Sequence, residues 1–158
     1  GLPFTIFRPH NIYGPRMGMA HVIPEQLKKA FDATPGDSIS VYSPDHRRAF
    51  CYVDDAVEML ERMLTSDSCD GETLNLGTQF PEVTIREVVQ ICTDIAGKAL
   101  QLEDFPVTPG SPERRAPDMT ITKQLLGYQS QVSLRYGIEK TWHWYREKVF
   151  QPSGVSAL

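Results

Sequence analysis

The sequence lacks the features that mark several large classes of protein. It has no apolar run near the ~20 residues that a membrane-spanning helix needs, and no basic segment followed by an apolar one at its start. Its three cysteines, Cys51, Cys69 and Cys92, are odd in number and show no metal-ligand spacing. Such cysteine usage is typical of a reducing compartment. We therefore expect a soluble, cytoplasmic protein with no membrane contact and no metal site.

A strongly basic region is also absent. The net charge is −4, and no basic run is longer than the pairs Arg47-Arg48 and Arg114-Arg115. Because a nucleic-acid surface needs a basic face, we expect no nucleic-acid partner, although either pair could hold a small anion. With 41% hydrophobic and 23% charged residues, the 158-residue chain has the composition of a folded domain with its own core.

Sequence motifs that carry catalysis are missing as well. There is no G-x-G-x-x-G or G-x-x-G-x-x-G loop to bind a pyrophosphate, and no G-x-S-x-G around a nucleophile. Tyr13, Tyr42 and Tyr52 each lack a lysine four residues later. The two arginine pairs and the missing catalytic motifs together predict a chain that binds an anionic ligand and has no catalytic residue of its own.

Strand-like and helix-like segments alternate along the chain, which predicts an α/β fold. Strands are expected at 3–8, 39–42, 49–53, 72–77 and 99–104, and helices at 22–31, 54–66, 85–96, 122–127 and 133–150. Thr84 and Glu87 form a capping box and Gly97 ends the same helix. On helix 54–66, Val57, Leu60 and Leu64 are expected to face the core.

Asn11 follows the first strand, where ligands of α/β proteins bind. Its amide could donate to a phosphate oxygen, or it could start a turn by bonding its own backbone. Arg48 and Arg115 could each grip a phosphate with a guanidinium fork. The alternatives are ion pairs: Arg48 with Asp54 or Asp55, and Arg115 with Glu113 or Asp118.

Three further residues have ordinary structural explanations beside a functional one. His10 and His21 flank one loop and could transfer protons, yet each could equally be a hydrogen-bonded loop histidine. Tyr42 could stack on a base or could pack as a core aromatic at the end of a strand. These alternatives stay open at the level of residue spacing.

Four segments, taken in order, resemble the extended short-chain dehydrogenase/reductases of the nucleotide-sugar epimerase/dehydratase family. They are "FTIFRPHNIYGP", "RRAFCYVDDAVEML", "TLNLGTQFPEVTIREVV" and "RRAPDMTITKQLLGYQSQVSLRYGIEKTWHWY". Ala49 departs from the aspartate of many members, and "GYQSQ" lacks the usual proline. The resemblance covers residues 2–145 and implies the C-terminal part of a Rossmann-type fold with a small substrate-binding α/β subdomain.

The resemblance also implies roles for individual residues. Asn11, Arg48 and Arg115 correspond to contacts with the substrate diphosphate and nucleotide. The remaining positions are Tyr42 beside the base, His21 and Val22 along the nucleotide, and Pro9 where the backbone passes the nicotinamide. By this comparison residues 1–150 form the substrate-binding half, with 1–10 ending the cofactor sheet and 151–158 a frayed tail.

The family's glycine-rich NAD loop and its Tyr-x-x-x-Lys pair precede the segment that this chain resembles. We therefore expect the parent protein to be an NAD-dependent epimerase that binds a nucleotide-diphosphate sugar and forms a homodimer. We expect the isolated chain to be inactive. Other readings are a dehydratase or decarboxylase fragment, a non-catalytic nucleotide-sugar binding or regulatory module, and a chain whose first strand pairs with another copy.

Overall fold

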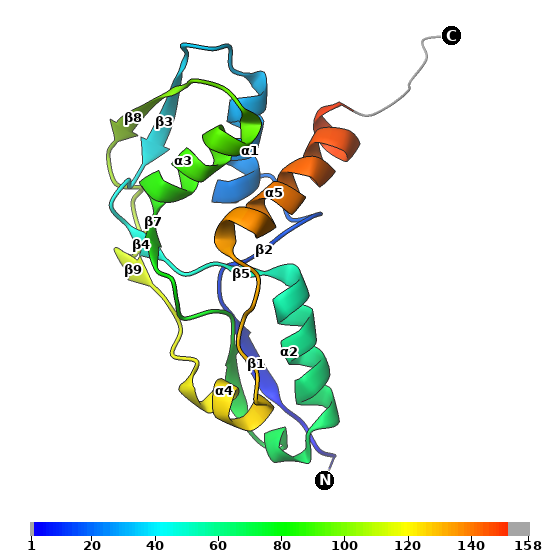
Figure 1. Ribbon diagram of the computed structural model, residues 1–158. Helices are drawn as coiled ribbons and strands as arrows, with labels where there is room; N and C mark the ends of the chain where they lie inside the picture. Colours follow the sequence, from blue (N-terminus) through cyan, green and yellow to red (C-terminus); the bar gives the residue numbers. More distant parts are fainter. Residues whose placement is uncertain (1, 152–158) are drawn as a thin grey trace. The chain divides into compact units, whose positions relative to one another are not determined.

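The computed structural model describes residues 2–151 (Figure 1). The expected frayed tail at 151–158 lies outside the described residues from position 152 onward. Strands and helices alternate along the chain, which confirms the α/β class. None of the described helices has the length and apolar character needed to cross a membrane. The elements, in chain order, are β1 (Ile6–Pro9), β2 (Ile12–Tyr13), α1 (Val22–Asp32), β3 (Ser38–Tyr42), β4 (Arg47–Arg48), β5 (Cys51–Tyr52), α2 (Val53–Thr65), β6 (Thr73–Leu76), β7 (Val83–Thr84), α3 (Ile85–Ala96), β8 (Gln101–Phe105), β9 (Arg114–Arg115), α4 (Thr120–Leu126) and α5 (Leu134–Tyr145).

The chain forms two compact units, each assembled from segments that are far apart in the sequence. Unit 1 contains Gly1–Tyr13, Arg47–Val83 and Glu113–Leu134. Unit 2 contains Gly14–His46, Thr84–Pro112 and Arg135–Leu158. Because the segments of the two units alternate, composition along the chain shows no interior boundary, and the sequence did not predict this division.

Unit 1 is built on the parallel pair β1 and β6, in register from Ile6↔Thr73 to Pro9↔Leu76. Its core consists of buried side chains from α2, β6 and α4 and from the segments beside them. The members are Cys51, Ala56, Met59, Met63, Cys69, Leu74, Leu76, Met119 and Leu126. The short strands β2 and β5 also pair in parallel, as do β4 and β9.

The core-facing side of α2 differs from the sequence prediction. Val57 is 55% exposed and Leu64 is 86% exposed, whereas Met59 and Met63 are buried. The helix carries two apolar stripes, and the methionine stripe packs on Leu74 and its neighbours. The prediction that Val57 and Leu64 face the core was therefore wrong for the described structure.

Unit 2 contains the parallel pair β3 and β8, with α1 and α3 packed together. The predicted capping box is present: the Glu87 backbone N–H donates to Thr84 Oγ1 at 3.1 Å, and the Thr84 N–H donates to Glu87 Oε2 at 2.6 Å. Gly97 ends α3 at φ 69°, a left-handed conformation that glycine adopts without a Cβ clash. This element follows the prediction closely.

In the last helix, the helical spacing of Leu134, Ile138, Trp142, Tyr145 and Val149 predicts that these side chains face inward. Ile138, Trp142 and Tyr145 on α5 are buried. The following turn, Arg146–Phe150, is a wider π-helical turn, and Val149 there is 41% exposed. The expected inward position of Val149 was wrong, because the wider turn changes the helical period that the prediction assumed.

Candidate functional site

Four arginines lie on the short parallel ribbon of β4 and β9 in unit 1. Arg47 is in register with Arg114, and Arg48 with Arg115. Because successive side chains of a strand point to opposite faces, the ribbon has one arginine pair on each face. Burial agrees with this arrangement, since Arg48 is only 7% exposed while its neighbour Arg47 is exposed.

Glu82 contacts both arginines of the pair formed by Arg47 and Arg114, but its carboxylate pairs only with Arg114. Arg114 donates twice to the Glu82 carboxylate, from Nε to Oε2 at 2.7 Å and from Nη2 to Oε1 at 2.6 Å. Arg47 Nη2 donates to the Glu82 carbonyl oxygen at 3.1 Å. The hydrogen bond from Arg114 lowers the pKa of Glu82 and raises that of Arg114. The face of the ribbon that carries Arg47 and Arg114 therefore already has an anionic partner, the Glu82 carboxylate.

The face with Arg48 and Arg115 has a different electrostatic environment. Arg48 Nη1 donates to the carbonyl oxygens of Arg47 at 2.7 Å and Glu113 at 3.2 Å. Burial, and then the positive charge of Arg115, lower the pKa of Arg48. Within residues 2–151, no carboxylate forms an ion pair with Arg115. Two like charges in register favour the binding of an anion between them.

Asn11 connects the start of β2 to this ribbon. Its Nδ2 donates to the carbonyl oxygens of Ala49 at 2.9 Å and Arg115 at 3.3 Å. Its φ of 44° is in the left-handed region that asparagine tolerates in turns. Its amide bonds these distant carbonyl oxygens, whereas the turn alternative expected a bond to its own backbone. The structure thus brings Asn11 together with Arg115, but it directs the amide at backbone oxygens. A contact between Asn11 and phosphate stays a prediction.

The remaining predicted residues fall into both units. Pro9 ends β1 in unit 1 and is exposed. In unit 2, His21 is the exposed N-cap of α1, followed by the half-buried Val22. Tyr42 ends β3, is 49% exposed, and packs against Phe105 with ring centroids 5.1 Å apart. The structure does not test the binding roles of these residues.

Two of the carboxylates proposed as alternative arginine partners, Asp55 and Asp118, have other contacts. Asp55 accepts from Tyr128 Oη at 2.6 Å and from the backbone N–H groups of Gln131 and Val132. Asp118 accepts from the Thr120 N–H at 2.9 Å. Sequence reasoning also missed Glu82, which lies 32 positions before its partner Arg114. No local spacing rule relates residues that far apart.

The chain is similar in sequence to a known family and to several curated proteins. Residues 1–77 match the model of the NAD dependent epimerase/dehydratase family. The chain is 31% identical over 141 residues to UDP-glucuronic acid decarboxylase 5 of Arabidopsis thaliana, covering 87% of this chain and 40% of that protein. It is 33% identical to UDP-N-acetyl-alpha-D-glucosaminuronate decarboxylase of Bacillus cytotoxicus, covering 93% of this chain and 47% of that protein.

Solved structures of epimerases are also similar to this chain. An epimerase of Methanothermobacter thermautotrophicus matches with a TM-score of 0.82 and 25% identity, over 92% of this chain and 44% of that one. A UDP-glucose 4-epimerase of Thermotoga maritima, solved with UDP-glucose, matches with a TM-score of 0.80 and 26% identity, over 92% and 46%. The chain spans less than half the length of these relatives. It is a partial homologue of the NAD-dependent nucleotide-sugar epimerases and decarboxylases, and residues 1–77 carry its match to the NAD dependent epimerase/dehydratase family.

Proposed function

We propose that the chain is the C-terminal, substrate-binding half of a nucleotide-sugar decarboxylase or epimerase, and that Arg48 and Arg115 bind the diphosphate of its substrate. The observation that carries the proposal is the difference between the two faces of the β4–β9 ribbon. The Glu82 carboxylate pairs with Arg114, whereas Arg115 forms no ion pair within residues 2–151 and lies in register with Arg48. A diphosphate would supply a negative charge for Arg115.

The substrate class follows from the relatives. Several of the similar proteins are named UDP-glucuronic acid decarboxylases. We propose UDP-glucuronic acid as the ligand to test first, with UDP-glucose as the alternative because a UDP-glucose 4-epimerase is also similar. Both share the diphosphate that the arginine pair would hold.

The sequence has no glycine-rich loop to hold the dinucleotide of NAD. By the family resemblance, NAD would supply the hydride acceptor and the Tyr-x-x-x-Lys pair that removes the hydroxyl proton would precede this segment. The one such spacing in this chain, Tyr136 to Lys140, falls instead in the tail motif "LRYGIEKTW". We expect the isolated chain to bind nucleotide sugar without converting it.

Calorimetric titration with UDP-glucuronic acid tests the proposal. Arg115→Gln is the main variant, because Arg115 is exposed and we expect its replacement to leave the fold intact. We expect its affinity to fall about tenfold or more, the typical effect of losing a charge-assisted phosphate contact. Arg48→Lys, which keeps the charge and loses the fork, should also weaken binding.

Arg114→Gln is the matched control, because it removes the same charge from the next position of the same strand. Its partner is Glu82, so its loss should leave the affinity for UDP-glucuronic acid almost unchanged. Equal losses in Arg114→Gln and Arg115→Gln would show only a general effect of net charge and would refute the proposed site. Unchanged binding in Arg115→Gln would refute it too.

A further inference from the structure

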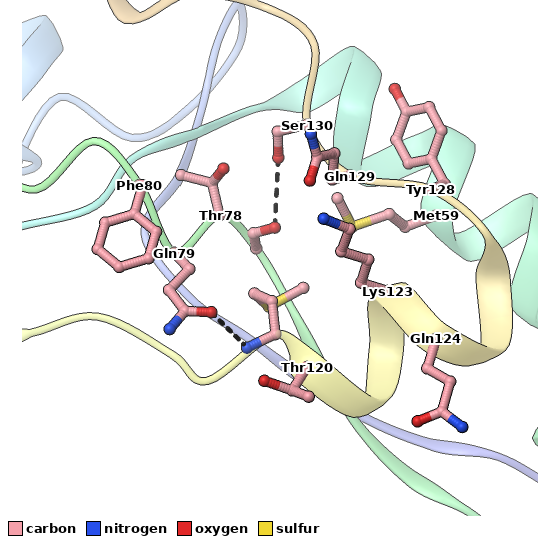
Figure 2. Close-up of a pocket in the computed structure, with 12 residues that line it drawn as sticks. Met59, Thr78, Gln79, Phe80, Thr120, Lys123, Gln124, Tyr128, Gln129 and Ser130 are labelled. Carbon is pink, nitrogen blue, oxygen red and sulfur yellow. Dashed lines mark hydrogen bonds between the residues drawn. The ribbon is translucent and has the colours of Figure 1, made fainter.

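Unit 1 contains a cavity separate from the arginine ribbon (Figure 2). Its volume is about 660 Å³, within the range of small-molecule sites. None of Asn11, Arg48 and Arg115 lines it. It is lined by residues from α2, from the segment after β6, and from α4 with the segment that follows. These are Met59, Gly77, Thr78, Gln79, Phe80, Met119, Thr120, Lys123, Gln124, Tyr128, Gln129 and Ser130.

One part of this lining is apolar. Met59 and Met119 are buried and belong to the core of unit 1. Phe80 is 69% exposed, although it is a large aromatic side chain. Methionine side chains adapt to flat or irregular apolar groups, so these residues provide an adaptable apolar surface for a ligand.

The polar part of the lining is rich in hydrogen-bond donors. Lys123 is the only ionised side chain among the described lining residues, and these residues include no carboxylate. Gln79 Oε1 accepts from the Met119 N–H at 3.2 Å, which leaves the Gln79 amide nitrogen as a donor. Figure 2 shows the Lys123 side chain directed toward Gln129 across the cavity. A ligand with one negative charge matches this set of groups.

The walls are held in place by hydrogen bonds. Thr122 Oγ1 on α4 donates to the Asn75 carbonyl oxygen at 2.8 Å, and Ser130 Oγ donates to the Gly77 carbonyl oxygen at 3.3 Å. Tyr128 donates to the buried carboxylate of Asp55. Because three separate segments are fixed in this way, the cavity is preformed, which lowers the entropic cost of binding.

We infer that this cavity binds a small amphipathic monoanion, a carboxylate attached to an aromatic or aliphatic body. Lys123 pairs with the carboxylate, the Gln79 amide donates to it, and Met59 and Met119 contact the apolar body. The ligand is distinct from the nucleotide sugar, which carries several negative charges and would meet only one cation here.

A nuclear magnetic resonance titration with 2-naphthoate, compared with the neutral 2-naphthamide, tests this inference. We expect saturable shifts in the backbone amides of Gln79, Lys123 and Gln129. Lys123→Gln should weaken naphthoate binding about tenfold, as loss of a charge-assisted hydrogen bond does. The amide should bind the unmodified chain about tenfold more weakly than naphthoate for the same reason. Lys148→Gln removes an equal charge from an exposed position and should have no effect.

The inference is overturned if naphthoate causes no saturable shifts at the cavity, or if Lys123→Gln binds it as tightly as the unmodified chain. Loss of ligand binding at the cavity can be distinguished from loss of ligand binding at the diphosphate site. Lys123→Gln should keep its affinity for UDP-glucuronic acid, and Arg115→Gln should keep its affinity for naphthoate. Loss of both ligands in either variant contradicts the assignment of two independent sites.

Discussion

At the scale of single residues, the charged side chains of unit 1 differ in the groups that surround them. Glu82 accepts two hydrogen bonds from Arg114, while Arg48 is buried close to the like charge of Arg115. Asp55 is the other buried charge of the unit, at 2% exposed, and it accepts from one hydroxyl and two backbone N–H groups. These hydrogen bonds connect the segment after α4 to α2.

Asp55→Ala should therefore destabilise the chain. Three donors, including two backbone N–H groups, would lose their partner, which costs about 2–4 kcal/mol of unfolding free energy. Asp54→Ala, next to it and exposed, should change that free energy by less than about 0.5 kcal/mol. Urea unfolding measures both. Similar losses in the two variants would contradict the proposed role of Asp55.

Cys51 predicts how stability depends on alkaline pH. Burial raises the pKa of the Cys51 thiol from 9.0 to about 11, against a smaller opposing effect of the hydrogen bond with Ser130. Between these two values the unfolded chain loses the thiol proton and the folded chain keeps it, so stability falls as pH rises. The expected loss is on the order of 2 kcal/mol by pH 11.

Urea unfolding at pH 8 and pH 10.5 measures this effect. Cys51→Ala cannot ionise at this position, so its stability should fall less between the two pH values than that of the unmodified chain. An equal fall in both proteins would show that Cys51 does not contribute to the alkaline loss.

At the scale of elements, α2 shows which part of helix packing the sequence determines. Its existence and length follow from helical spacing, but its orientation does not, because Val57 and Leu64 form one apolar stripe and Met59 and Met63 another. The fold buries the methionines, and with them the carboxylate of Asp55. Only the partners of the helix, which are distant in sequence, decide between the two stripes.

Two substitutions on α2 distinguish these stripes. Met63→Ala should lower the unfolding free energy by about 2–5 kcal/mol, because it leaves a cavity in the core of unit 1. Leu64→Gln, at a position that is 86% exposed, should change it by less than about 0.5 kcal/mol. A larger loss in Leu64→Gln than in Met63→Ala would reverse the assigned core face.

The candidate site shows the same limit of sequence reasoning. Local patterns predict the capping box of α3, because Thr84 and Glu87 are three residues apart. They do not predict β9, which has two residues and pairs with β4 from 67 positions away, as Arg47↔Arg114. The resemblance to a known family indicated Arg115. The pairing of Glu82 with Arg114 required the structure.

At the scale of the whole molecule, unit 1 exposes large apolar side chains along its first strand and the residues before it. Phe4, Ile6 and Phe7 are 60%, 51% and 48% exposed. An apolar strand with an accessible edge is a template for pairing with another chain. We expect the isolated chain to associate with itself as its concentration rises.

Light scattering after size-exclusion chromatography tests this expectation. Phe4→Lys combined with Phe7→Lys should shift the chain toward monomer, because charge on an edge strand opposes pairing. Val107→Lys, at a position in unit 2 that is 57% exposed, is the control and should not. A monomer at every concentration without any substitution would contradict the prediction.

Calorimetry with UDP and with uridine tests most directly whether Arg48 and Arg115 form a diphosphate site. We expect the unmodified chain and Arg114→Gln to bind UDP at least about tenfold more tightly than uridine. We also expect Arg115→Gln to lose most of this difference. Equal affinities for UDP and uridine in the unmodified chain, or an undiminished preference for UDP in Arg115→Gln, would contradict it.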